Sequence, residues 1–379
     1  MPAIPPKHPQ YTFGETFSGL STFDLVDDTL YILYTGNDDA ALGPRQLLRS
    51  FDLRSEDSKH EWAGLNRMER TTARDASCDT WVDGDAYVIC GDTPELLDRN
   101  TFEVLYSERD GLLQEGWDDY SWIHYWGGVV YRFVDLGNPG SGIDVVSLQG
   151  GTPKVVEHLD VDIDPSGTGH GQYIAGLREG GGAAVYALGE RRYVFEAAED
   201  GVHYRHGRQT NGVAFEGGRV FFLLGDTLLV GSLATGEVLH RINYLALPRF
   251  QQYLQEHGRE EQASFAAEMA VLGDKVFLGG TWLRGYLLCI DLALGDAAWL
   301  RASAHQIETL TARGDLVYGL ETLVPTAWDI HTGEPAWQSE QSIRGHRVQI
   351  NDRWLVIAGS KGDTHCYPLK TPYLTKQSG

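Results

Sequence analysis

The sequence predicts an all-β fold, a β-propeller of seven or eight four-stranded blades, with eight favoured by the count. The main observation is that residues 270–337 carry the same pattern twice, first as GDKVFLGG and LLCIDLALGDAAW, then as GDLVYGLE and AWDIHTGEPAW. Asp291 and Trp299 in the first copy correspond to Asp329 and Trp337 in the second, 38 residues later in both cases. A repeat of about 40 residues built from strand-like runs is typical of propeller blades. The 45 glycines and the 11% aromatic content also favour β structure.

The remaining strand-like runs divide into blades of the same kind. In chain order, the eight blades are expected at residues 27–62, 81–108, 122–159, 172–197, 217–244, at the two copies within 270–337, and at 348–370. The leading strand of the fourth blade cannot be placed from sequence, which leaves seven blades as the alternative count. The last blade lacks its outermost strand, and the alternating run Tyr11 to Phe17 is the expected partner that closes the ring.

These boundaries give one propeller domain over residues 11–370, preceded by an extended segment, 1–10, and followed by a tail, 371–379. One helical insertion is expected at about 247–269, because Pro248 can open a helix and apolar residues follow at helical spacing. Gly258 is expected to divide this insertion into two short helices.

The pattern resembles the repeat of the pyrroloquinoline-quinone-like propellers, written loosely as [LI]DxxTGxxxW. Asp329 to Trp337 (DIHTGEPAW) fits it fully, Asp291 to Trp299 lacks the Thr, and Ser232 to His240 keeps only Thr235 and Gly236. The resemblance implies a fold and not an activity. A quinone dehydrogenase is disfavoured by the lack of a vicinal Cys pair, and no cofactor is expected.

Composition restricts the class of partner. The formal net charge is −22, which disfavours a nucleic-acid or anionic-membrane surface and suits a basic protein partner. Residues 75–119 carry 13 acids against two Arg residues, although such a run can also be a solvated face. No apolar run long enough to span a membrane and no leader are seen, and the four Cys lack a CxxC, so a cytoplasmic location is expected.

Candidate metal and catalytic residues form no firm set. Asp160, Asp162 and Asp164 alternate as in a calcium loop, but Pro165 replaces the Gly of such a loop, so no metal is predicted. His124, His170 and His305 are candidates for a lyase or hydrolase site at the central channel, acting on a sugar or small molecule. Ordinary core histidines are the competing interpretation.

The most unusual local composition is GWDDYSWIHYW, which combines five Trp and Tyr rings with two adjacent carboxylates, a mixture that suits protein recognition. Packing between blades is the competing explanation for these rings. The predicted partner-binding residues come from this segment and from the helical insertion: Trp117, Asp118, Asp119, Tyr120, Trp122, Tyr125, Trp126, Phe250, Tyr253 and His257. The resulting hypothesis is a non-catalytic, protein-binding propeller, with an immunity protein that neutralises a toxin effector as one specific form.

Overall fold

A computed structural model describes the fold. The described residues are 4–14, 21–37, 44–54, 57–65, 79–90, 94–107, 123–134, 142–150, 152–163, 169–178, 181–198, 212–257, 266–280, 285–303, 306–359 and 362–369. They form eight four-stranded antiparallel sheets and one short α-helix, so the protein is an eight-bladed propeller, as the repeat predicted. The chain divides into two compact units: Gly14–Tyr204, here the N-terminal unit, and Met1–Phe13 with Arg205–Gly379, here the C-terminal unit.

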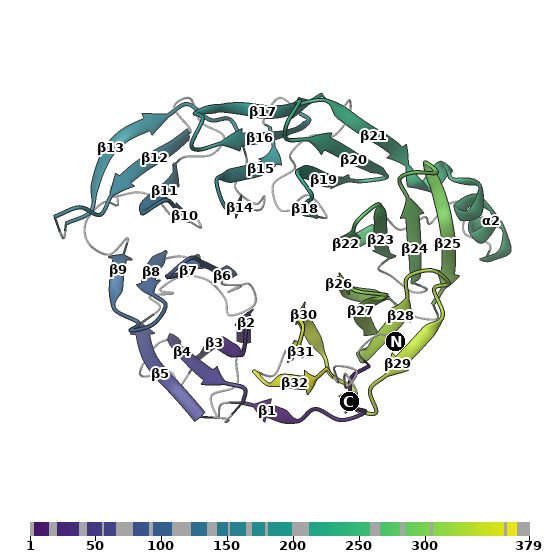
Figure 1. Ribbon diagram of the computed structural model, residues 1–379, viewed down its shortest axis with the longest axis horizontal. Helices are drawn as coiled ribbons and strands as arrows, with labels where there is room; N and C mark the ends of the chain where they lie inside the picture. The colour runs from purple at the N-terminus through teal and green to yellow at the C-terminus, as the bar shows by residue number, and fades with distance from the viewer. Residues whose placement is uncertain are drawn as a thin grey trace, which may run out of the picture. The chain divides into compact units, whose positions relative to one another are not determined.

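The N-terminal unit holds blades 1 to 4 (Figure 1). Blade 1 comprises β2 (Ser21–Val26), β3 (Thr29–Asn37), β4 (Pro44–Asp52) and β5 (Asp57–Leu65). Blade 2 comprises β6 (Asp79–Asp83), β7 (Ala86–Cys90), β8 (Glu95–Asp98) and β9 (Val104–Ser107). Blade 3 comprises β10 (Ile123–Trp126), β11 (Val129–Val134), β12 (Gly142–Ser147) and β13 (Lys154–Leu159). Blade 4 comprises β14 (Gly169–His170), β15 (Tyr173–Leu177), β16 (Ala183–Ala187) and β17 (Arg192–Ala197).

The C-terminal unit holds blades 5 to 8. Blade 5 comprises β18 (Val213–Glu216), β19 (Arg219–Leu224), β20 (Thr227–Ser232) and β21 (Val238–Asn243). Blade 6 comprises β22 (Ala266–Leu272), β23 (Lys275–Gly280), β24 (Tyr286–Asp291) and β25 (Asp296–Ala302). Blade 7 comprises β26 (Ile307–Arg313), β27 (Leu316–Glu321), β28 (Val324–Asp329) and β29 (Pro335–Gln338). Blade 8 comprises β30 (Gly345–Ile350), β31 (Trp354–Gly359), β32 (Thr364–Pro368) and β1 (Tyr11–Phe13).

The last blade takes its fourth strand from the start of the chain, as expected. Thr12 of β1 stands opposite His365 of β32 in an antiparallel pair. The segment before β1 is also held, because the carbonyl of Lys7 accepts hydrogen bonds from the Ser339 hydroxyl (3.1 Å) and the Glu340 amide (3.0 Å). The N-terminal segment therefore covers the edge that blade 8 would otherwise expose.

The third and fourth strands of seven blades share an irregularity. In each of blades 1 to 7 their register shifts by one residue at a β-bulge, whereas β32 pairs with β1 without a shift. The extra residue on the fourth strand is, for example, Leu105 in blade 2, Val156 in blade 3 and Leu239 in blade 5. A bulge bends its strand and increases the local twist. The outermost strand of each of these blades is therefore bent at the same place.

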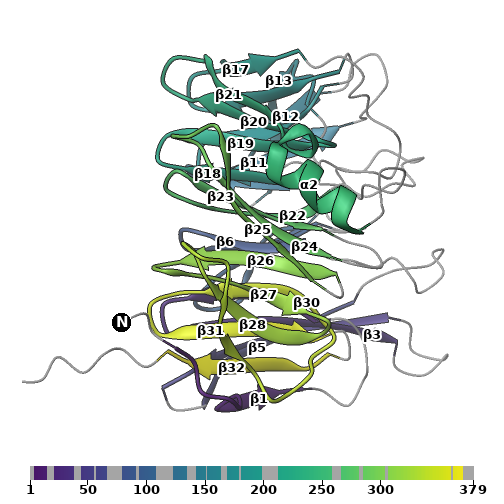
Figure 2. The ribbon, with the colours of Figure 1, turned by 90° about the vertical axis from the view of Figure 1, so that its right-hand side faces the viewer.

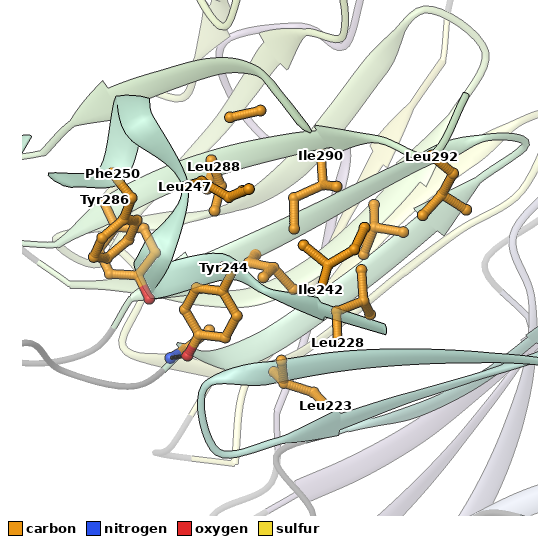
Figure 3. Packing of buried hydrophobic residues seen from close by; sticks show 14 of the residues in the cluster. Leu223, Leu228, Ile242, Tyr244, Leu247, Phe250, Tyr286, Leu288, Ile290 and Leu292 are labelled. Atoms are coloured by element: carbon orange, nitrogen blue, oxygen red, sulfur yellow. Dashed lines mark hydrogen bonds between the residues drawn. The ribbon is translucent and has the colours of Figure 1, made fainter. Parts of the chain in front are cut away.

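Apolar clusters lie between consecutive blades within each unit. One cluster joins blades 5 and 6 through residues such as Leu228, Ile242, Leu288 and Ile290, all at most 8% exposed (Figure 3). Similar clusters join blades 6 and 7, blades 7 and 8, and, in the other unit, blades 1 and 2, 2 and 3, and 3 and 4. Each blade thus hides apolar faces that a single sheet could not bury alone.

The repeated Trp fills the space between blades. Trp299 of blade 6 donates a hydrogen bond from Nε1 to the carbonyl of Ile330 in blade 7 (2.9 Å), and its ring packs against Gly333. Trp337 of blade 7 packs edge-on against Tyr367 of blade 8, with ring centroids 5.6 Å apart. Trp299 and Trp337, which hold the same position in the two copies of the repeat, therefore make equivalent contacts with the next blade.

The Asp of the repeat holds its turn through backbone amides. Asp329 Oδ1 accepts bonds from the amides of His331 and Thr332, both at 2.9 Å, and from the Thr332 hydroxyl. Asp98 in blade 2 makes the same set of bonds with Asn100 and Thr101. There the glycine position is occupied by Phe102, which adopts a φ of 60°. Blade 2 therefore has the turn of the repeat without the sequence that would reveal it.

The helical insertion is shorter than predicted. The helix α2 covers Pro248–His257, and Ala266 to Met269, expected to be helical, are part of β22 (Figure 2). Pairing with β23 overrides the helix-favouring composition of these four residues. The second short helix expected after Gly258 falls on residues 258–265, outside the described residues. Within the part of the chain that the structure describes, no helix has the length and apolar content to cross a membrane.

Candidate functional site

The predicted aromatic and acidic segment is described only at its end. Trp117, Asp118, Asp119, Tyr120 and Trp122 lie outside the described residues. Tyr125 and Trp126 form the end of β10, the first strand of blade 3, immediately before the Gly127–Gly128 turn. Both side chains are partly buried.

Tyr125 and Trp126 point to different neighbours. Successive residues of a strand face opposite sides. Tyr125 packs on the cluster between blades 2 and 3, and Trp126 packs on the cluster between blades 3 and 4. Gly189 lies against the Trp126 ring, since a Cβ added there would be 2.9 Å from Cη2. These two rings therefore contribute to packing between blades and do not form one continuous aromatic surface.

Two carboxylates of blade 2 lie close to the Tyr125 phenol. Asp83 ends β6 and Asp85 follows in the turn to β7. Burial raises the pKa of Tyr125, and the negative charges of Asp83 and Asp85 raise it further. Asp85 is 85% exposed and is 3.7 Å from the guanidinium of Arg99. The Tyr125 ring, with its polar hydroxyl, therefore lies beside the two acidic side chains. Tyr125 and Asp83 each lie at the end of the first strand of their blade, and the two blades are neighbours.

Asp83 is the more buried of the two acids. Burial raises the pKa of its carboxyl, and the nearby His170, which precedes the β14–β15 turn, opposes that shift. Its Oδ2 atom is buried and has no hydrogen-bond partner among the described residues. A carboxylate oxygen in that position gains stability from any cationic group brought to it. Asp83, Asp85, Tyr125 and His170 are named here the acidic turn site.

His124 lies next to this site and has a structural role. Its side chain is buried, Nε2 is 2.7 Å from the carbonyl of Gly171, and a Cβ at Gly169 would be 2.3 Å from Nδ1. Burial lowers the pKa of His124, and the charge of His170 lowers it further, while the bond to Gly171 opposes both. The neutral ring with Nε2 protonated, which donates to Gly171, fits these surroundings.

The structure therefore brings two of the three candidate catalytic histidines near each other. His124 and His170 come from adjacent blades and interact electrostatically, whereas His305 lies outside the described residues. Of the alternating acids, Asp162 forms an ion pair with Arg178 (3.3 Å), and Asp164 lies outside the described residues. No group of three or more His, Cys, Asp or Glu side chains within the described ranges is arranged to hold a metal ion.

The residues predicted on the helix differ in their exposure. Phe250 is 0% exposed and packs against Tyr286 of β24 (Figure 3). Tyr253 is 5% exposed, and its ring also packs against Tyr286. They fix α2 to blade 6, so a partner reaching this helix would meet its outward residues. His257 is partly exposed at the C-terminus of α2, with Nδ1 2.9 Å from the Tyr253 carbonyl.

Sequence comparison identifies no relatives: no protein family and no curated protein matches this chain. Solved structures do match it, and the three described next each cover at least 94% of this chain. The Saccharomyces cerevisiae protein Sqt1 matches with a TM-score of 0.64 and 9% identity, covering 96% of this chain and 100% of Sqt1. BamB from Moraxella catarrhalis matches with a TM-score of 0.63 and 10% identity, covering 96% and 98%. The computationally designed Ika8 protein matches with a TM-score of 0.61 and 14% identity, covering 94% and 98%.

At these identities the match is one of fold. The resemblance to the pyrroloquinoline-quinone-like propeller repeat is confirmed at that level.

Sequence reasoning did not single out Asp83, Asp85 or His170 as partners of Tyr125. The signals were the Asp-Gly-Asp turn at residues 83–85 and the acid excess of residues 75–119. Neither signal shows that the turns of blades 2, 3 and 4 lie together, because only the stacking of blades brings them into contact.

Proposed function

We propose that this chain is a non-catalytic scaffold that binds a basic protein partner through the acidic turn site. The observation that carries the proposal is the pair of carboxylates, Asp83 and Asp85, beside the partly exposed Tyr125. An Arg or Lys side chain from a partner would find both the charge and a ring against which to pack. The net charge of −22 supports the choice of a basic partner, because complementary charge speeds association and disfavours acidic competitors.

The burial of Asp83 makes this site more than a general acidic surface. A fully solvated acid contributes little to binding because water and salt screen it. Asp83 is partly withdrawn from water, so a guanidinium placed there would replace few water contacts and gain a stronger electrostatic interaction. Tyr125 would act as the rigid anchor that is common at the centre of protein interfaces.

A finer form of the proposal is that the chain is an immunity protein that neutralises a toxin effector. Such a protein needs a tight complementary surface and no catalytic group, and acidic repeat surfaces suit the task. The expected toxin is basic at the surface that it presents to Asp83 and Asp85. Co-expression tests this form directly: a partner that stops growth when expressed alone should be tolerated when this chain is co-expressed.

The binding proposal is tested in two steps. The chain is purified from its native host with its partner, and the partner is identified by mass spectrometry. The affinity of that partner is then measured for the wild type and for the double variant Asp83→Asn, Asp85→Asn. We expect a loss of at least tenfold at low salt, and a smaller loss as salt rises.

A matched control removes two exposed acids elsewhere, Glu334→Gln and Glu340→Gln, whose side chains are 77% and 60% exposed. This variant has the same net charge as the double Asp variant. Equal loss of affinity in both variants would mean that net charge alone drives binding, and the acidic turn site would be rejected.

The competing class is an enzyme with a His and carboxylate site. The nearness of His124, His170 and Asp83 is the observation that favours it. Against it, the Nε2 atom of His124 is bonded to the carbonyl of Gly171 and the side chain is only 3% exposed. A partner whose affinity is unchanged by the two Asp substitutions, together with turnover that His170→Ala abolishes, would establish the enzyme instead.

A further inference from the structure

An exposed hydroxyl and a buried imidazole face each other across β1 and β32 of blade 8. Thr12 of β1 stands directly opposite His365 of β32, and the two strands lie side by side in Figure 1. Thr12 is exposed, whereas His365 is 2% exposed. The Thr12 Oγ1 atom lies 3.3 Å from His365 Nδ1. Thr12 is therefore reachable from solvent while its hydroxyl contacts a ring nitrogen.

The second nitrogen of the His365 ring is held by a carboxylate. Nε2 lies 2.8 Å from Oδ2 of Asp363, two residues earlier in the chain. The amide of Gly359 donates to the Asp363 carbonyl, and a Cβ at Gly359 would be 2.0 Å from Asp363 Oδ1. The glycine thus leaves the space that this carboxylate occupies.

The carboxylate determines which nitrogen of the ring carries the proton. A carboxylate only accepts hydrogen bonds, so Nε2 of the neutral His365 ring carries the proton and donates to Asp363. Nδ1 then offers a lone pair, and the Thr12 hydroxyl is the donor across the 3.3 Å contact. A hydroxyl, an imidazole and a carboxylate in this order form the arrangement that activates a nucleophilic oxygen.

Two other pairs of an imidazole and a carboxylate lack the hydroxyl. His158 Nδ1 lies 2.9 Å from Asp144 Oδ1, and His8 Nε2 lies 3.2 Å from Glu340 Oε2. Neither ring contacts a hydroxyl through its second nitrogen among the residues that the structure describes. The His365 side chain is also 2% exposed, against 45% and 69% for these two rings. Its hydrogen bonds therefore lie in less polar surroundings, where they are stronger.

We propose that Thr12 is an activated hydroxyl that takes up an acyl group from a small activated donor, an acyl thioester or an aryl ester. His365 is the base that receives the hydroxyl proton, and Asp363 is a positioning residue that keeps Nδ1 unprotonated. Because this arrangement supplies only a base, the donor has to carry a good leaving group.

The step balances without oxidation or reduction. The Thr12 Oγ1 atom attacks the acyl carbonyl carbon while its proton passes to His365 Nδ1. The bond from that carbon to sulfur, or to the aryl oxygen, then breaks, and the leaving group departs with the proton. His365 returns to its neutral form, and Thr12 carries the acyl group as an ester.

Uptake of one acyl group would act on the closure of blade 8. An acylated Thr12 has no proton to donate to His365, so one of the contacts between β1 and β32 is lost. The modified chain should therefore hold β1 less tightly. The proposal requires no turnover and is independent of the acidic turn site, which lies in the N-terminal unit.

The test is acetylation of the purified full chain by p-nitrophenyl acetate, followed by peptide mapping with mass spectrometry. We expect Thr12 to be acetylated at least about 100-fold faster than Thr235, the size of effect that a positioned base supplies. Thr235 is the internal control, because it is also exposed and its hydroxyl bonds to the Glu237 carboxylate (3.2 Å) without an imidazole. Alkaline hydroxylamine should remove the ester from Thr12 and leave acetylated lysines intact.

Variants separate activation from simple exposure. Thr12→Ser keeps the hydroxyl and should keep the rapid acetylation. Asp363→Asn should slow it by at least about tenfold, because the Asn amide can donate to Nε2 and favours the proton on Nδ1. Asp352→Asn is the matched control: it makes the same change of charge in blade 8, at a side chain that is 86% exposed, and should leave the rate unchanged.

Two outcomes would overturn the proposal: acetylation of Thr12 no faster than that of Thr235, or an equal rate in the wild type and in Asp363→Asn. If Asp363→Asn does not fold, the comparison of Thr12 with Thr235 in the wild type decides the question, since it needs no variant.

Discussion

Gly295 and Gly333 occupy the same turn position in blades 6 and 7 but differ in what surrounds them. Both have positive φ, 65° and 74°. A Cβ at Gly295 meets nothing within 4 Å, whereas a Cβ at Gly333 would be 2.7 Å from the Trp299 ring. Gly295→Ala should therefore cost about 1 kcal/mol from its backbone conformation alone. Gly333→Ala should cost about 1–3 kcal/mol more, because it also displaces the Trp299 ring.

Urea unfolding of the two Gly variants measures this difference. The comparison is matched, since the substitution and the turn are the same. Equal losses of unfolding free energy in both variants would show that the Trp299 ring moves without cost, and the account of the contact between blades 6 and 7 would be wrong.

Trp299 and Trp337 form a second matched pair. They are 6% and 5% exposed, but only Trp299 donates a hydrogen bond, to the Ile330 carbonyl. The Nε1 atom of Trp337 is buried without a hydrogen-bond partner among the described residues. Trp299→Phe leaves the Ile330 carbonyl without its donor, so we expect it to cost about 1–2 kcal/mol more than Trp337→Phe. Thermal and urea unfolding of both variants check this expectation, and a reversed order would contradict it.

At the residue scale, the sequence predicts what a side chain does where the repeat motif is intact. The motif from Asp329 to Trp337 fits the propeller repeat fully, and it predicted blade 7. The equivalent turn at Asp98 was hidden because Phe102 takes the glycine position with positive φ. Phe102 is 5% exposed and contacts Tyr31, so burial of its ring offsets the cost of that conformation. A packing contact that offsets backbone strain in this way leaves no recognisable pattern in the sequence.

Among the elements, β1 has three residues but completes a whole blade. Removal of residues 1–13 would leave β32 with an unpaired edge and would remove the stacking of Tyr11 on Trp354. We expect a lower unfolding temperature and concentration-dependent aggregation, because exposed strand edges pair with one another. Differential scanning calorimetry and light scattering measure the two effects. A control that lacks only residues 1–3 should behave as the wild type.

Elements were predictable according to the strength of their periodicity. The apolar strands of blades 5 to 8 followed from sequence, as did the start of α2 at Pro248. β14 was not predictable, since Gly169 and His170 carry no strand pattern and pair only because β15 lies beside them. The composition of Ala266 to Met269 favours a helix, and pairing with β23 makes it a strand. A local sequence pattern does not predict the element where pairing with a neighbouring strand determines the structure.

At the scale of the whole molecule, the cysteines report on folding. Cys90, Cys289 and Cys366 are each 0% exposed, and burial raises the pKa of Cys289 to about 12 and that of Cys366 further. Thiols react as thiolates, so these three should be inert in the native state. In a Cys78→Ser variant we expect no maleimide labelling of the native protein and three labels after unfolding. Rapid labelling of native Cys90, Cys289 or Cys366 would contradict the described packing.

The count of eight blades was predictable from the number of repeated units in the sequence. The unit recurs because each blade needs neighbouring blades to bury its apolar faces. The net negative charge is read directly from composition, and it is one basis for proposing a basic partner. The acidic turn site was not predictable, since Asp83, Tyr125 and His170 belong to three blades and come together only through stacking.

The shared bulge of blades 1 to 7 has a consequence for how such a chain can change. It points one residue of the outermost strand away from the sheet in several blades, which leaves Leu105, Val156 and Leu239 39%, 58% and 44% exposed. Substitutions at these three places alter what the molecule presents to others and leave its interior intact. New specificities can therefore be selected on the edge of the blades at little thermodynamic cost.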